Sequence, residues 1–204
     1  GESGEKENDS KAKSKEALFN TDISLKNNWL QEFWMDFRKR FISLLSYQFG
    51  QFSSVFALNI LQNPSIKPSS NLNELSRDEL LENFTTYDLK RLELYSQNLA
   101  DYHLIVDLLP AVARLYFLDR FGSSFHMSHV QNAILLSIGL QHNDVDKISA
   151  ELNLPSTQVL GLFSRSIKKI SNYFTALREK EIEGQLKMRN VGQTKLNPLP
   201  QSLD

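Results

Sequence analysis

The sequence predicts an all-α protein, a single helical bundle of about seven helices whose last two form a helix-turn-helix-like pair. Apolar residues recur at helical spacing from about residue 28 to residue 187, and no segment alternates as a strand would. Serine, threonine and glycine stand where helices are expected to begin and end. With 204 residues, 41% of them hydrophobic, the chain can bury a substantial core.

Residues 29–52 carry the densest helical pattern. Aromatic and leucine side chains recur along one side of this stretch, at Leu30, Phe33, Trp34, Phe37, Phe41, Leu44 and Leu45. Gly50 is expected to bend the chain before a short helix over residues 55–62. Two prolines and polar neighbours then predict a loop from Pro64 to about Asn71.

Capping residues mark the next two helices. Ser76 and Glu79 have the spacing of a capping box, which predicts a helix to about Phe84. Thr86 is expected to cap the helix that follows.

A long apolar pattern over residues 101–121 passes through Pro110, where a break or kink is expected, and Gly122 is expected to end it. Ser128 and Gln131 predict another capped helix, which closes near Gly139.

Residues 144–173 have the spacing of a helix-turn-helix, with a turn at residues 154–156 and Ser156 expected to cap the second helix. One stripe of that second helix is apolar and comprises Val159, Phe163, Ile167, Ile170, Phe174 and Leu177.

The two ends differ from the middle of the chain. Residues 1–27 are polar and charged and predict a flexible linker, whereas residues 188–204 contain two prolines and predict a flexible tail. Because the sequence starts with Gly1 rather than Met, we expect it to be part of a longer protein. The helical domain is placed between them, over residues 28–187.

Composition excludes several classes of function. The net charge of −1 means that any polyanion site must be a local patch. The sequence has no cysteine for disulfides or thiolate metal sites, no transmembrane-length apolar run, and no phosphate-binding loop of the G-x-x-x-x-G-K-[ST] type. His126-x-x-His129 straddles a helix start without a third ligand nearby, so no metal site is predicted.

The strongest indication of a binding site is a group of basic residues. Opposite the apolar stripe stand Arg165, Lys168 and Lys169, and no acidic residue occurs between residues 156 and 177. Unpaired cations along one side of a helix are suited to phosphate contacts. An ordinary helical hairpin with a solvated face stays an alternative. A reader of duplex DNA is another, although the acids at 144, 146 and 151 would repel its phosphates.

Two further basic groups are secondary candidates for RNA contacts. Arg38, Lys39 and Arg40 spread around their helix, and Asp36 is placed to pair with Arg40 at i,i+4. Lys90 and Arg91 are expected to be exposed one turn into their helix.

Several long strings also carry a family resemblance. They are FRKRFISLLSYQF (37–49), FALNIL (56–61), YDLKRLELYSQNLADYHLIVDLLPAVARLYF (87–117), ILLSIGLQH (134–142) and LNLPSTQVLGLFSRSIKK (152–169). Over residues 29–186 the sequence resembles the C-terminal region of the eukaryotic RNA cytidine acetyltransferases, a region regarded as a tRNA-binding domain.

The resemblance implies a parent enzyme that uses acetyl-CoA and ATP to form N4-acetylcytidine in small-subunit ribosomal RNA and in tRNA. It also implies localisation in the nucleus and nucleolus, and ribosome-assembly factors as partners. This part would carry no catalytic residue and no cofactor, and would hold or position RNA. The alternative is a structural module that packs the parent enzyme's modules together or forms a homodimer; no membrane role is expected.

Overall fold

The structure is a computed structural model that describes residues 29–64 and 74–193, with side chains as far as residue 180. The described residues are helical or irregular and contain no strand, which confirms the all-α prediction. The chain divides into two compact units, residues 1–72 and 73–204, whereas the sequence predicted one bundle over residues 28–187. The division falls at the predicted loop after Pro64, most of which lies outside the described residues.

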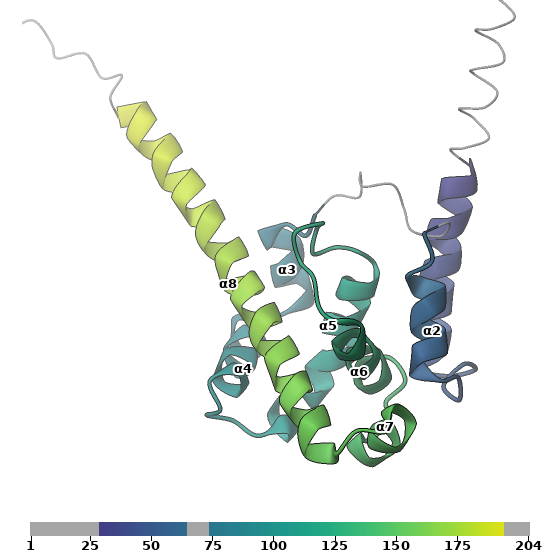
Figure 1. Cartoon of the computed structure of the whole chain (residues 1–204). Coiled ribbons are helices and arrows are strands. Elements are labelled where there is room, and N and C mark those ends of the chain that lie inside the picture. Colours follow the sequence, from purple (N-terminus) through teal and green to yellow (C-terminus); the bar gives the residue numbers. More distant parts are fainter. Residues whose placement is uncertain (1–28, 65–73, 194–204) are drawn as a thin grey trace, which may run out of the picture. The chain divides into compact units, whose positions relative to one another are not determined.

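Unit 1 contains two helices, a long one over residues 29–45 and α2 (Ser54–Leu61), which lie side by side (Figure 1). Turns over residues 46–52 connect them, and Ser53 caps α2 by accepting the amide of Phe56 at 3.4 Å. Aromatic rings contact one another in sequence from the first helix through the turn to α2; the series is Trp29, Phe33, Trp34, Phe37, Phe41, Phe49, Phe52 and Phe56.

Unit 2 begins with two short helices whose caps differ in detail from the predicted ones. Ser76 accepts the amide of Glu79 at the start of α3 (Arg77–Asn83), while the Glu79 carboxylate pairs with Arg120. The next helix, α4 (Thr86–Ser96), is capped by Thr85 and not by Thr86 as predicted. Thr85 forms the full capping box because the Asp88 carboxylate, three residues on, accepts its backbone amide at 2.8 Å.

The predicted long helix around Pro110 is instead three short pieces. Two 3-10 turns, η1 (Tyr102–Leu104) and η2 (Val106–Leu108), precede α5 (Leu109–Phe117). Pro110 therefore lies in the first turn of α5 and does not kink the helix. Backbone amides in the first turn have no acceptor within the helix, so a proline there removes no hydrogen bond. Since α5 ends at Phe117, Gly122 lies in the following loop with a φ of +74°.

The centre of unit 2 is α6 (His129–Gly139), which Ser128 and Gln131 open with the predicted capping box. Its residues 132–139 are all buried. Gly139 allows the close packing of α6 on α5, since a Cβ at this position would lie 2.6 Å from that of Ala113.

The last two helices are α7 (Val145–Leu152) and α8 (Ser156–Gln193). Asp144 caps α7, and Asn153 ends it in the left-handed conformation. Ser156 is the first residue of α8 instead of its cap, and its hydroxyl donates to Asp146 at 3.5 Å.

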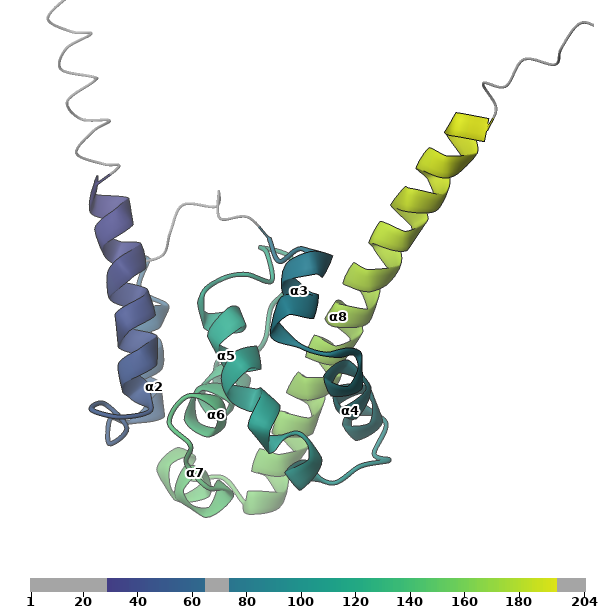
Figure 2. The same ribbon diagram turned by 180° about the vertical axis from the view of Figure 1, so that it is seen from behind.

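Helix α8 spans one side of unit 2, where it packs on α3, α4, α6 and α7 (Figure 2). Its C-terminal part extends away from these helices. The helix continues to Gln193, although the sequence predicted a tail from residue 188. Helix-forming residues dominate residues 178–193, and the next proline is Pro198. Residues 1–28 and 194–204, most of the predicted linker and tail, lie outside the described residues.

Candidate RNA-binding surface

The position of α8 is fixed by its apolar stripe. Five of the six predicted stripe residues are buried; these are Val159, Phe163, Ile167, Ile170 and Phe174, while Leu177 is half-buried. Burial of this stripe against α3, α4, α6 and α7 turns the opposite side of the helix to solvent.

Arg165, Lys168 and Asn172 form the exposed side of α8. Their spacing of three and four residues places them in one line along the helix. In the part of the chain that the structure describes, the side chains of Arg165 and Lys168 make no ion pair or hydrogen bond. We call Arg165, Lys168, Lys169 and Asn172 the α8 basic face.

Lys169 differs from the other two cations. Its ammonium donates to the backbone carbonyl of His126 and lies 5.3 Å from the centre of the Phe125 ring. Lys169 therefore holds the loop before α6 against α8, at the edge of the basic face. The sequence did not predict this contact, since 43 residues separate its two partners.

The three consecutive basic residues of unit 1 differ in exposure and in their partners. The predicted pair is confirmed, because Arg40 lies 2.8 Å from Asp36, and both side chains are exposed. Lys39 is exposed as well. Arg38 is only 3% exposed, so the structure contradicts its prediction as a surface phosphate contact. Arg38 lies at the margin of the apolar stripe and is buried with it.

Lys90 and Arg91 are both engaged in ion pairs. Lys90 lies 3.0 Å from Glu93. The Arg91 guanidinium lies 2.5 Å from Asp88 and 2.9 Å from Asp107, and it also donates to the carbonyl of Leu104. Arg91 thus joins α4 to the two 3-10 turns. The hydrogen bond from Arg91, with a further one from Thr85, lowers the pKa of Asp88 below its ordinary value.

Replacing Arg91 with methionine is expected to lower the free energy of unfolding by about 1–2 kcal/mol at neutral pH, because two carboxylates lose a charged donor. The lowered pKa of Asp88 stabilises the fold above pH 4, roughly its unfolded pKa, and this contribution is lost as the pH falls through the folded value. Urea unfolding at pH 7 and pH 3 should therefore show a smaller pH dependence in R91M. Lys90→Met, at an exposed pair, should change stability by less than about 1 kcal/mol; equal losses in both variants would contradict this account.

The helix-turn-helix-like pair is present, but its charges do not suit a duplex reader. A reader of this type places the N-terminal residues of its second helix in the groove while the first helix crosses the backbone. Here Asp146 of α7 bonds the first residue of α8, and Asp144 stands at the cap of α7. The nearest cation on α8, Arg165, comes ten residues into the helix. The cations of the α8 basic face therefore lie in the middle of α8 and not at its start.

One cation of α8 was missed from the sequence. Arg178 ends the acid-free run that begins at Ser156, and it is half-buried beside α4. The sequence did contain a signal for Arg178, because the acid-free run extends to this residue and the first acid after it is Glu179. Among the described residues no three His, Asp or Glu side chains gather to hold a metal ion. No helix in the described ranges has the length and apolar character needed to cross a membrane.

Residues 29–202 match the family model described as a possible tRNA binding domain. The chain belongs to this family. It is similar to part of the RNA cytidine acetyltransferases of Mus musculus (50% identity over 169 residues) and Saccharomyces cerevisiae (48% over 168). It is also similar to part of RNA cytidine acetyltransferase 1 of Arabidopsis thaliana (32% over 173).

These alignments cover 83%, 78% and 82% of this chain, in the same order, but only 16% of each relative. The chain thus spans about a sixth of the length of the relatives it matches. The similarities confirm the resemblance found in the sequence. The matched region of the family includes both α4 and the α8 basic face.

Proposed function

We propose that this chain is the RNA-holding part of an RNA cytidine acetyltransferase, and that the α8 basic face binds RNA phosphates. The observation that carries the proposal is the exposure of Arg165 and Lys168 on a helix with no acid between residues 156 and 178. The family's description as a possible tRNA binding domain and the name of the relatives support it.

Each cation on this face acts by neutralising a phosphate and releasing its counterions. Arg165 and Lys168 can turn fully toward a ligand, whereas Lys169 is held by the loop before α6 and contributes at the edge. Arg40 and Lys90 have acidic partners and are weaker candidates, while Lys39 is exposed in unit 1. A surface of this kind holds RNA in place and does not by itself select a sequence.

For the parent protein we propose acetylation of cytidine in tRNA and in the small-subunit ribosomal RNA precursor, with acetyl-CoA and ATP. We propose that other modules of the parent protein bind both cofactors. The same proposal places the protein in the nucleus and nucleolus, with ribosome-assembly factors as partners.

Titration of the chain with a fluorescent structured RNA at several salt concentrations tests the RNA-binding role. Two to three phosphate contacts predict that the logarithm of the binding constant falls with the logarithm of salt with a slope of about −2. Binding that is absent even at low salt, or that does not respond to salt, would contradict the proposal.

A second candidate function is structural. In unit 1, Trp29, Phe33 and Phe56 are each more than half exposed, although their rings belong to the continuous aromatic series. Exposed aromatics of this size are typical of an interface. Such an interface would pack the parent enzyme's modules or two protomers together. Sedimentation of the chain distinguishes the two candidates, because a stable dimer that does not bind RNA favours the structural role.

A further inference from the structure

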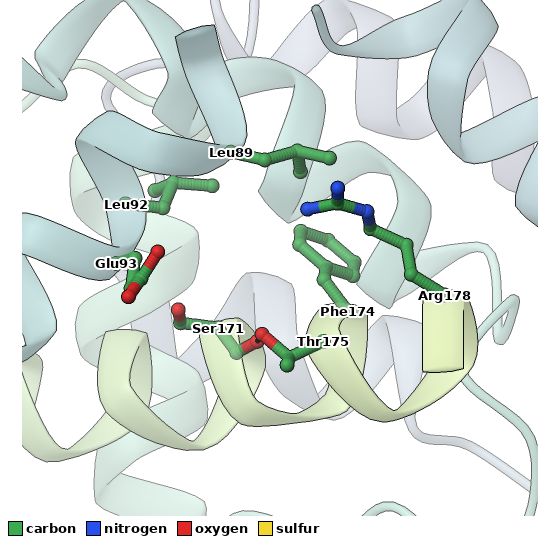
Figure 3. Close-up of a pocket in the computed structure, with 7 residues that line it drawn as sticks. All are labelled: Leu89, Leu92, Glu93, Ser171, Phe174, Thr175 and Arg178. Carbon is green, nitrogen blue, oxygen red and sulfur yellow. Dashed lines mark hydrogen bonds between the residues drawn. The ribbon is translucent and has the colours of Figure 1, made fainter. Parts of the chain in front are cut away.

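A small notch lies between α4 and α8 (Figure 3). Its floor is apolar and consists of Leu89, Leu92 and Phe174, which are each no more than 6% exposed. Its volume of about 20 Å³ has room for about one water molecule or one hydroxyl group.

Polar groups of opposite charge stand at the two ends of the notch. Figure 3 shows the Arg178 guanidinium beside Phe174 and Leu89, and the Glu93 carboxylate next to Leu92. Ser171 and Thr175 line the wall formed by α8. The notch therefore offers a cation, a carboxylate and hydroxyl oxygens around an apolar floor.

Glu93 retains the capacity to accept another hydrogen bond. Its carboxylate accepts from Lys90 at 3.0 Å and from Gln97 at 3.2 Å, which leaves acceptor positions on both oxygens. The hydrogen bond from Lys90 lowers the pKa of Glu93, so the group is ionised at neutral pH and can only accept. An ionised carboxylate beside a phosphate is unfavourable unless the ligand brings a donor to it.

The notch also continues the line of the basic face. Lys168 and Thr175 are seven residues apart, which is about two turns of helix, so they lie on the same side of α8. A polynucleotide strand held by Arg165 and Lys168 would pass along this side and reach the notch at Thr175 and Arg178. A phosphate further along the strand and its adjoining sugar would then face both charged groups.

We propose that the notch is a ribonucleotide subsite, in which Arg178 holds a phosphate and Glu93 accepts a hydrogen bond from the 2′-hydroxyl of the adjoining ribose. The hydroxyl occupies the small cavity above Leu89, Leu92 and Phe174, and the sugar ring lies at the mouth of the notch. This inference rests on the proposed RNA-binding function and adds a preference for ribose over deoxyribose, since DNA has no hydroxyl to give to Glu93.

The experiment compares the affinity of the full chain for a single-stranded RNA and for the DNA of the same sequence. The wild-type chain is expected to bind the RNA about tenfold more tightly, the effect of one hydrogen bond to a charged acceptor. Glu93→Ala should lower the RNA affinity about tenfold and leave the DNA affinity unchanged or higher. Glu93→Gln keeps an acceptor oxygen and should keep most of the preference. Glu82→Ala, at an exposed acid of α3, is the matched control and should change neither.

Two results would overturn the subsite. One is equal affinity of the wild-type chain for RNA and DNA; the other is a rise of both affinities in Glu93→Ala, which would show that Glu93 only repels phosphate. Both leave the α8 basic face intact as a phosphate-binding surface. Absence of binding to either nucleic acid at low salt would instead refute the proposed function itself.

Discussion

Replacing Phe163 with alanine is expected to lower the free energy of unfolding of this protein by about 3–5 kcal/mol. The Phe163 side chain is fully buried, and its ring lies 6.0 Å from that of Tyr95 and 5.8 Å from that of Tyr102. The substitution removes these contacts and leaves a cavity between α8, α4 and η1. Because domains of this size are stable by only about 5–15 kcal/mol, urea unfolding should show a large fall of the midpoint.

Leu160→Ala is the matched control for this prediction. Leu160 lies one turn before Phe163 on α8 but is 40% exposed, so its loss should cost less than about 1 kcal/mol. Equal losses of stability in the two variants would contradict the packing of α8 on the other helices of unit 2. A loss of less than about 1 kcal/mol in Phe163→Ala would contradict it as well.

Reversing Arg165 and Lys168 together to glutamate is expected to weaken RNA binding by about 10- to 100-fold at roughly 0.1 M salt. Two phosphate contacts are lost, and two negative charges replace them. The salt slope should become shallower by about 1.4–1.8, roughly 0.7–0.9 for each contact, and the remaining dependence comes from Lys169. Both side chains are exposed and make no ion pair or hydrogen bond in the described part of the chain, so the stability of the fold should hardly change.

The control for net charge is the double variant Arg114→Glu and Lys147→Glu. These two cations are exposed on α5 and α7 and not on α8, and their reversal changes the net charge by the same amount. RNA affinity measured by fluorescence anisotropy should fall far less in this control. An equal fall in both double variants would show that RNA responds to the total charge and not to the α8 basic face.

The sequence could predict the features that depend on near neighbours. The capping box of Ser128 and Gln131 involves residues three apart, the pair of Asp36 and Arg40 involves residues four apart, and the structure contains both. The stripe from Val159 to Phe174 follows from helical periodicity, and so does the exposure of Arg165 and Lys168 opposite it. These features give both the fold class and the main part of the candidate surface.

Contacts between distant residues could not be predicted in the same way. Arg91 looked like an exposed cation in the sequence because Asp107, 16 residues on, is brought to it only by the 3-10 turns. Lys169 and His126, and Arg120 and Glu79, are more than 40 residues apart. The notch at Glu93 and Arg178 likewise exists only because α4 packs on α8. The burial of Arg38 could not be predicted from helical periodicity alone either.

Lysine footprinting with an amine-reactive reagent tests the central claim, RNA binding by the α8 basic face, most directly. The chain is labelled with and without saturating RNA, and the modification of each lysine is read by mass spectrometry. Lys168 should become protected by RNA, whereas Lys147 on α7, which donates to Asn143 at 2.8 Å, should keep its reactivity. Equal labelling of Lys168 with and without bound RNA would contradict the account.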